Sequence, residues 1–572
     1  LNACVYSGFH IKVLNVFGIW LEAANGGGDE DRTRATGLRL GPQDGPGGSA
    51  LATSLAERRL SIFVGTWNMG EGNIGNDDAL AAWIEDGHDL YCVGVQECLI
   101  VDDVEAAVGR VLAARSSADG KDEWQSWKHS IGSERTEVGF HGFIAIVVFV
   151  RKSEVDSGNF EPTGRATGTK GGQLATGKNV GGKKMANKGA VGCSFRWCDT
   201  TLAFANAHLA SDAGDGTSKA EKRNDDAYNI LRYLKIDMED VEFDWPLLHH
   251  QAFFLGDLNY RINMQPEEAL QATVSAVRAN DWSRLHEADE LIAEMRGNRV
   301  FSGFEEANSG PDFPPTYRRV RGASPGDYSD LEHVKSCYTL SVPRGKDGET
   351  APRTPSWCDR VLLHSTEGQR GKIKCTSYRL CDALLPSDHV PVAATYELSV
   401  DVDHPAFSTR DGLREVPQIR ATMLFSELTL DSGLGEVFTP SSYTTVLPLP
   451  AEDPVGQSAK LAELGGALTA YTTTSEGRVD RLQSMRMSPD EAERSQTHRV
   501  SVQLPQEARL AAKMHMGIKA VDANQSSVAQ GVLPLADVII AAVGSGDAEA
   551  AAVRFDIPMS LGGVPRARLR GL

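Results

Sequence analysis

The feature that most constrains the fold is a series of strand-like apolar runs between about residues 60 and 400. These runs include SIFVGTWNM, HDLYCVGVQE, GFIAIVVFV, TLAFANAHLA, AFFLGDLN, CDRVLLH and VPVAATYEL. Stretches with helical periodicity lie between some of them, such as DDAYNILRYLKID (225–237) and WSRLHEADELIAEMR (282–296). Strands that alternate with helices in this way predict a layered α/β or α+β domain.

The rest of the 572-residue chain has a different character. Residues 1–22 contain strand-like runs that fit a remnant of an upstream domain, and residues 23–58 are Gly-rich and charged, which is typical of a linker. After a second linker at 401–415, runs such as IRATMLFSELTL, HRVSVQLPQ and GVLPLADVIIAAV predict an all-β domain over 416–572.

Composition excludes several classes of protein. The formal net charge of −19 argues against a general nucleic-acid binder, whose surface is usually basic. The nine cysteines show no CxxC pair or regular spacing, which fits reduced thiols of an intracellular protein better than a disulfide framework. No apolar run approaches the roughly 20 residues that a transmembrane helix needs.

Polar side chains gather at the ends of the strand-like runs. Asp257 and Asn259 follow the run AFFLG, and residues two apart on a strand project from the same face. Taken alone, GDLN is explained equally well by a turn. Asn206 and His208 repeat the same spacing, however, and this repetition favours one shared site. The other strand ends carry Asn68, Gln96, Glu97, Asp359, Arg360, Asp388 and His389.

The acids and amides at these strand ends predict a site for a hard metal ion. Glu97, Asp388, Asn68 and Asp257 offer oxygen ligands, and no Cys/His set has the spacing of a zinc site. Oxygen ligands suit Mg²⁺, which keeps several waters and is commonly bound together with phosphate groups. Histidines beside such a site can contact phosphoryl oxygens, and a neighbouring Asp favours their cationic form.

Eight motifs, in order between residues 60 and 400, resemble those of the inositol polyphosphate 5-phosphatases. They are GTWNMG, QE, NKGAVG, HLAS, GDLNYRI, FPPTYR, PSWCDRVL and SDHVPV. That family belongs to the endonuclease/exonuclease/phosphatase superfamily. The resemblance implies that residues 59–400 form a catalytic domain of class α+β. It also implies a four-layer α/β/β/α sandwich, with the site at one edge of its two sheets.

The resemblance implies Mg²⁺-dependent removal of the phosphate at inositol position 5. By motif, Glu97 would be the principal metal ligand, with Asn68 and Asp388 nearby. Asp257 would be the general base on the attacking water, and Asn259 would orient that water and bind the phosphoryl group. Phosphoryl transfer depends on positioning and charge neutralisation, so no cysteine is given a catalytic role.

The resemblance also assigns the phosphate contacts. His389 would stabilise the scissile phosphate while Asp359 holds its ring, and His208 would bind the same phosphate. Where many family members carry a lysine, this chain has Ala351, so we expect a weaker grip on the 4-phosphate and a gain from a lysine there. The residues expected to contact the rest of the substrate are Asn187, Lys188, Tyr317, Arg318, Arg353 and Arg360.

The implied substrates are PI(4,5)P2 and PI(3,4,5)P3 at a membrane surface, together with soluble inositol phosphates. The implied location is the cytoplasm, peripheral to the cytosolic face of membranes, with no nucleic-acid partner. The Gly/Lys-rich segment at 165–184 is expected to aid docking on anionic membranes.

Two alternatives have to be weighed. A nuclease or sphingomyelinase of the same fold shares the Asp/Asn and Asp/His pairs, but WCDR, NKG and PPTYR argue against it. An inactive phosphoinositide-binding scaffold would lack a metal or base residue, and every key position is present. For the C-terminal domain, the family offers two precedents, a C2-like lipid-binding sandwich and an immunoglobulin-like partner-binding sandwich, and the strand spacing permits either.

Overall fold

Two β-sheets form the centre of the larger domain. The first sheet contains, in spatial order, β16 (Ile373–Leu380), β17 (Val392–Asp401), β1 (Glu57–Asn68), β2 (Leu90–Cys98), β4 (Phe143–Arg151) and β3 (Trp124–Gly132). The second contains, in spatial order, β12 (Phe304–Glu306), β15 (Asp359–Ser365), β11 (Gln251–Asp257), β10 (Thr200–His208), β9 (Gly189–Trp197) and β5 (Phe160–Pro162), with β6 (Gly172–Ala175) also paired to β9. Two short hairpins, β7 (Asn179–Val180) with β8 (Lys183–Lys184) and β13 (Ser341–Arg344) with β14 (Glu349–Pro352), lie outside these sheets.

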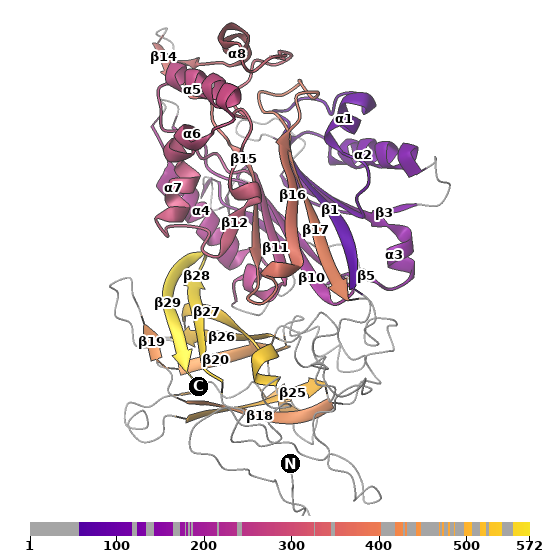
Figure 1. Ribbon diagram of the computed structural model, residues 1–572, viewed down its shortest axis with the longest axis vertical. Helices are drawn as coiled ribbons and strands as arrows, with labels where there is room; N and C mark the ends of the chain where they lie inside the picture. The colour runs from indigo at the N-terminus through magenta and orange to yellow at the C-terminus, as the bar shows by residue number, and fades with distance from the viewer. Residues whose placement is uncertain are drawn as a thin grey trace, which may run out of the picture.

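Helices cover the outer face of each sheet (Figure 1). The apolar side chains of α1 (Asp77–Trp83) and α2 (Val101–Ser116) pack on the first sheet, and those of α4 (Ala220–Tyr233) and α7 (Glu290–Arg296) pack on the second. The structure thus confirms the α+β class and the four-layer sandwich. The other helices described in this domain are α3 (Lys152–Asp156), α5 (Pro266–Ala279), α6 (Ser283–Ala288), α8 (Leu331–Cys337) and the 3₁₀ turns η1 (Trp245–Leu248), η2 (Ala307–Ser309) and η3 (Arg370–Lys372).

The computed structural model describes residues 57–401 with short gaps, and parts of the chain beyond residue 417. The expected upstream remnant, nearly all of the Gly-rich linker and nearly all of the second linker lie outside the described residues. The gaps before residue 401 are 117–122, 133–141, 164–171, 178, 181–182, 185–186, 214–216, 237–242, 325 and 345–348. The described parts after it are 418–426, 429–431, 442–447, 468–469, 472–473, 479–480, 485–486, 497–505, 515–521, 526–539 and 553–571.

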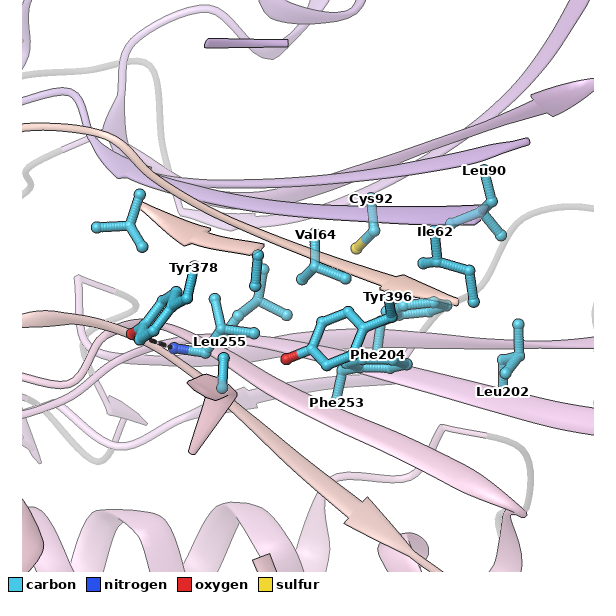
Figure 2. Packing of buried hydrophobic residues seen from close by; sticks show 14 of the residues in the cluster. Ile62, Val64, Leu90, Cys92, Leu202, Phe204, Phe253, Leu255, Tyr378 and Tyr396 are labelled. Carbon is cyan, nitrogen blue, oxygen red and sulfur yellow. Dashed lines mark hydrogen bonds between the residues drawn. The ribbon is translucent and has the colours of Figure 1, made fainter. Parts of the chain in front are cut away.

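Apolar side chains fill the space between the two sheets (Figure 2). Phe204 of β10 and Phe253 of β11 stack with ring centroids 5.0 Å apart, and Tyr396 of β17 meets Phe253 edge-on at 5.1 Å. Complete burial of side chains of this size stabilises the fold by about 1.5–3 kcal/mol each. This core holds the two sheets in a fixed relation, on which the geometry at their shared edge depends.

Side chains alternate between the two faces of a strand, so the face that packs in the core continues to that edge. On β11, Phe253 and Leu255 face the first sheet, and Asp257 follows two positions later on the same face. On β10, Phe204 faces the first sheet, and His208 lies four positions further on the same face. The sequence of each strand therefore places an apolar anchor first and a functional side chain at the end.

The second domain is all-β, as the strand pattern predicts. Its main sheet carries the last two hairpins of the chain, which lie below the sandwich in Figure 1. Its C2-like or immunoglobulin-like character stays a prediction. Its strands are β18 (Gln418–Ser426), β19 (Thr429–Asp431), β20 (Ser442–Leu447), β21 (Leu468–Thr469), β22 (Thr472–Thr473), β23 (Val479–Asp480), β24 (Met485–Arg486), β25 (Thr497–Pro505), β26 (His515–Val521), β27 (Ser527–Pro534), β28 (Phe555–Leu561) and β29 (Val564–Gly571).

Asp244, next to η1, joins the two domains. Its carboxylate accepts a hydrogen bond of 2.5 Å from the Gly562 N–H in the β28–β29 turn, and its own N–H donates to Gln530 Oε1 at 2.7 Å. On the same turn, the Gly563 carbonyl accepts from the Ser302 N–H at 2.7 Å. The two domains therefore meet through buried hydrogen bonds.

Candidate active site

Strand register brings three of the expected residues onto one line across the second sheet. His208 of β10 pairs with Asp257 of the parallel neighbour β11, and Asp257 pairs with Asp359 of the antiparallel neighbour β15. On the other side, His208 pairs with Gly189 of β9, so Lys188 lies directly beside the histidine. The three side chains point to the same face because paired residues on adjacent strands share their orientation.

Asp257 is the centre of the cluster. Its Oδ2 atom accepts a hydrogen bond from Asn68 Nδ2 at 2.9 Å, and lies 3.1 Å from His208 Nε2 and 3.9 Å from His389 Nε2. Burial alone would raise the pKa of this carboxyl, but the charges of His389, His208 and Lys188 hold the pKa well below its usual range. The carboxylate is therefore ionised at neutral pH, as an acceptor of a proton must be.

His389 faces Asp257 from the opposite side and is held by Asp359. Asp359 Oδ2 accepts from His389 Nδ1 at 2.9 Å and from the Thr316 hydroxyl at 2.6 Å. Burial opposes the charged imidazole, but Asp359 and Asp257 prevail and raise the pKa of His389 to about 9. At neutral pH the ring is thus a cation, with Nε2 directed toward the site.

His208 lies between two charged neighbours. Its Nε2 atom contacts Asp257 and the Lys188 ammonium group. Burial is the main reason why the pKa values of both His208 and Lys188 are lowered. The structure brings His208 and Lys188 to the site, but they contact each other, and His208 also contacts Asp257, so a phosphate would have to compete for their donors.

Asn259 is fixed at its backbone and at both ends of its amide. Its backbone N–H donates to Asp257 Oδ1 at 3.1 Å, and its φ of 58° lies in the left-handed region that Asn tolerates. Its Nδ2 donates to the Leu209 carbonyl at 3.2 Å, and its Oδ1 accepts from Arg261. The strand and the loop after it thus position the amide beside the carboxylate.

Asn206 shares the strand face of His208 but has a structural role. It is fully buried, donates to the carbonyls of Val95 and Ala145, and accepts from Gln96. These bonds tie β10 to the first sheet just below the site. The close approach requires Gly94 on β2, where a Cβ atom would lie 2.7 Å from the Asn206 side chain.

The oxygen donors of Glu97 and Asn68 fit a hard divalent cation. Glu97 lies where the register of β2 against β4 shifts by one residue, and its φ of 49° turns the chain there. Among the described residues, His208 at 3.9 Å is its ion-pair partner within 4 Å, so the carboxylate is not committed to an Arg or Lys. The Asn68 amide oxygen accepts only from the Gly70 N–H in the described chain.

Asp388 fits a metal less well. Its carboxylate pairs with Arg318 at 3.1 Å and with Arg321 at 3.3 Å, so its charge is already balanced by two guanidinium groups. Asp388 would bind a metal only after giving up these partners. Ligand atoms of Asp257, Asp359 and His389 also lie within 4.8 Å of one another, but there the imidazolium itself supplies the positive charge.

Of the residues expected to contact the substrate, some lie beside the Asp257 cluster and Arg353 does not. Tyr317 packs its ring on His389 at 4.5 Å, and Arg318 lies beside it, paired with Asp388. Asn187 is half-buried next to Lys188, at the same edge. Arg353 donates to the Pro352 carbonyl, and in the described part of the chain no contact joins it to the Asp257 cluster.

Two expectations about the substrate site are wrong. Arg360 is fully buried; its Nε and Nη2 groups donate to the two oxygens of Glu306 at 2.5 Å, and its Nη1 group donates to both oxygens of Asp289 at 3.0–3.1 Å. It directly follows Asp359 on β15, so strand alternation turns it to the opposite face. Ala351 is 1% exposed and paired with Val342, so a lysine there would be buried instead of reaching a phosphate.

Three residues that support the site were not identified by the sequence analysis. Thr316 binds Asp359, Arg321 binds Asp388, and Arg261 binds Asn259. Thr316 and Arg261 stand inside the quoted motifs FPPTYR and GDLNYRI, so their position beside assigned residues was the available signal. Arg321 lies outside the motifs, and only the three-dimensional contact reveals it.

Known proteins match the sequence of the larger domain. A model of Endonuclease/Exonuclease/phosphatase family 2 matches residues 65–395. The phosphatidylinositol 3,4,5-trisphosphate 5-phosphatase 2B of Danio rerio is 29% identical over 363 residues, which cover 60% of this chain and 25% of that protein. The phosphatidylinositol 3,4,5-trisphosphate 5-phosphatase 1 of Mus musculus is 31% identical over 357 residues, which cover 60% of this chain and 26% of that protein. The chain thus spans about a quarter of the length of these curated relatives.

Solved structures also align with the chain. The inositol polyphosphate 5-phosphatase domain of a synaptojanin, crystallised with inositol (1,4)-bisphosphate and calcium, is 23% identical, with a TM-score of 0.43 over 60% of this chain and 86% of that one. A Cimex nitrophorin ferrous NO complex is 17% identical, with a TM-score of 0.39 over 60% of this chain and 99% of that one. The family model, which matches more than half of the residues, shows that the chain belongs to the endonuclease/exonuclease/phosphatase family 2.

Proposed function

We propose that this chain is a Mg²⁺-dependent phosphatase that removes the 5-phosphate from phosphoinositides. PI(4,5)P2 and PI(3,4,5)P3 are the proposed lipids, with soluble inositol polyphosphates as further substrates. The observation that carries the proposal is the buried Asp257 carboxylate, which faces the imidazolium of His389 and is held by Asn68 and His208. The names of the relatives in Danio rerio and Mus musculus support the choice of substrate class.

In the proposed reaction, Asp257 accepts a proton from a water molecule that attacks phosphorus in line with the leaving inositol oxygen. Asn68 and the Asn259 backbone N–H fix the two carboxylate oxygens, so the base keeps one orientation. The His389 cation, held by Asp359, balances the negative charge that develops on the phosphoryl oxygens.

Glu97 and Asn68 would hold the metal at the end of β1 and β2. A bound Mg²⁺ would neutralise phosphate charge during the reaction. Asp388 forms ion pairs with Arg318 and Arg321, so it would bind the metal only if a substrate phosphate replaced it as the partner of these arginines. Competition of this kind would couple substrate binding to completion of the metal site.

We further propose that the chain acts at the cytosolic face of membranes, where Tyr317, Arg318, Arg353, Asn187 and Lys188 contact the inositol head group. In the described part of the chain, no helix has the length and apolar character needed to cross a bilayer. Much of the Gly/Lys-rich segment at 165–184 lies outside the described residues, and its membrane role stays a prediction.

The test is a phosphate-release panel with phosphoinositides, soluble inositol phosphates, DNA and sphingomyelin, each with Mg²⁺ and with excess chelator. We expect Mg²⁺-dependent release from the 5-position, identified by product analysis, and a loss of about 10²–10⁴-fold in Asp257→Asn. Asp89→Asn is the matched control. The Asp89 carboxylate accepts a hydrogen bond from the Ser61 N–H, and the neighbouring Leu90 pairs with the end of β4 that lies away from the site. Cleavage of DNA or sphingomyelin alone would favour the alternative enzymes, and phosphoinositide binding without turnover would favour the scaffold.

A further inference from the structure

Arg261 lies between two parts of the site that come from distant segments. Its Nη2 group donates to the Asn259 side-chain oxygen, and its guanidinium carbon lies 4.4 Å from the centre of the Tyr317 ring. Its side chain is 12% exposed. Nothing in the proposed reaction so far gives this buried cation a role.

The contact with Asn259 determines which end of the amide faces which neighbour. An arginine has only donors, so it selects the oxygen of the amide. The Nδ2 group of Asn259 must then point the other way, toward the Leu209 carbonyl at 3.2 Å beside Asp257. Without Arg261, the Leu209 carbonyl alone would hold the amide, and the side chain could rotate away from its place beside Asp257.

The contact with Tyr317 supports the other side of the site. The Tyr317 ring lies with one side near Arg261 and packs on the His389 ring at 4.5 Å. A cation over an aromatic face contributes attraction beyond simple packing. Arg261 thus holds a ring that limits the movement of the His389 imidazole.

Arg261 is itself held from two directions. Its backbone N–H donates to Glu290 Oε2 at 2.9 Å, and its Nε lies 3.7 Å from Asp212 Oδ2. Both carboxylates are fixed by the fully buried Arg223, at 2.6 Å from Glu290 and 2.7 Å from Asp212. The backbone of Arg261 is thus anchored by Glu290, and its guanidinium is held by the Asp212 ion pair, the Asn259 oxygen and the Tyr317 ring.

We propose that Arg261 is a positioning residue that sets the amide orientation of Asn259 and the place of the Tyr317 ring. Through these contacts it aligns the base side and the imidazolium side of the site on one phosphoryl group. The proposal rests on the proposed phosphatase function, so its test includes a measurement that does not depend on turnover.

The kinetic arm compares Arg261→Met with Arg261→Lys. We expect Arg261→Met to lower kcat about 10- to 100-fold because small misplacements at a reacting centre have effects of this size. KM should change less than about threefold, since Arg261 does not contact the substrate directly. Arg261→Lys keeps a donor for Asn259 and should recover part of the lost kcat. If the Met variant folds poorly, the Lys variant takes its place in the comparison with the parent.

The control is Arg151→Met. Arg151 also stacks on an aromatic ring, at 5.2 Å from Trp124, and lies 3.6 Å from the Asp89 carboxylate, at the end of β4 remote from Glu97. This variant should keep kcat. An equal loss of kcat in the Arg151 and Arg261 variants would show a general stability effect and overturn the proposal.

A double-mutant cycle separates positioning from general support. In an Asn259→Ala background, Arg261→Met should lower kcat clearly less than it does in the parent, because residues that act through each other are not additive and only the Tyr317 contact is left to lose. If the two losses multiply, Arg261 does not act through Asn259 and the proposal fails.

Crystal structures of the parent and of Arg261→Met provide the arm that is independent of activity. We expect the Asn259 side chain to rotate and the Tyr317 ring to shift in the variant, with Asp257 unmoved. Unchanged side chains would overturn the inference even if kcat falls. If the parent releases no phosphate from any phosphoinositide, the proposed function fails, while these structures still decide the role of Arg261.

Discussion

Asp359 and His389 are joined by a 2.9 Å hydrogen bond between Oδ2 and Nδ1, although 30 positions separate them in the sequence. Both side chains are buried, and the Thr316 hydroxyl donates to the same carboxylate oxygen at 2.6 Å. This pair turns an ordinary imidazole into a cation that stays charged well above neutral pH. It is the part of the site whose titration is easiest to test.

The first prediction concerns the pH dependence of Asp359→Asn. Against the opposing effect of burial, Asp359 and Asp257 raise the pKa of His389 to about 9, so the imidazolium is lost as the pH rises through that value. Removing the Asp359 charge should lower this pKa and move the alkaline limb of the kcat–pH profile to lower pH. A limb that stays in place would show that His389 is not the group that titrates. Asp89→Asn should leave the profile unchanged.

The second prediction tests the corrected role of Arg360. Arg360→Met would leave Asp289 and Glu306 without their buried cation, which typically costs about 3–5 kcal/mol of unfolding free energy. Chemical denaturation measures this loss, and KM of the folded enzyme should match that of the parent. A raised KM with unchanged stability would restore Arg360 to the substrate site.

The third prediction concerns the metal ligands. Glu97→Gln should raise the Mg²⁺ concentration that gives half-maximal activity, because it removes a carboxylate that has no arginine or lysine partner within 4 Å among the described residues. Asp388→Asn should have a smaller effect, since Arg318 and Arg321 already neutralise that carboxylate. The reverse order would mean that Asp388 leaves its arginines and becomes the main ligand.

The fourth prediction concerns the contact between the two domains. Burial raises the pKa of Asp244 to about 6, against the opposing effects of Arg232 and the Gly562 N–H. A carboxyl with a raised pKa contributes stability that is complete below its unfolded value of 3.8 and is lost as the pH rises through about 6. Asp244→Asn keeps an acceptor for Gly562 but does not ionise.

Unfolding free energies of the parent and Asp244→Asn, measured between about pH 3.5 and 7.5, should therefore diverge as the pH rises from 3.8 to about 6. The parent should lose up to about 3 kcal/mol relative to the variant over the full titration, since one pKa unit corresponds to about 1.4 kcal/mol. Parallel curves would show that Asp244 does not titrate at the interface. Asp89→Asn is again the control, because the Asp89 carboxylate binds Ser61 and Arg151 of the first sheet.

Much of the site could be predicted from the sequence because the information is local. Strand alternation alone places Asp257 on the same face as Phe253 and Leu255, and the ordered motifs indicate the family. The same local rule identifies Arg360 as a residue of the opposite face, once Asp359 is known to face the site. That mistake came from following the motif instead of the alternation.

What only the tertiary structure decided depends on contacts between distant segments. The extra residue that turns Glu97 into the site appears only in the pairing of β2 with β4, and the strand pattern does not show it. Asp388 is paired with arginines, and Ala351 is buried, because of neighbours that no local pattern specifies. The sequence by itself thus determined which side chains stand at each strand end, through period-two alternation. The long-range packing of two sheets decided which of these side chains meet, because distance and burial set the partner and the charge of each group.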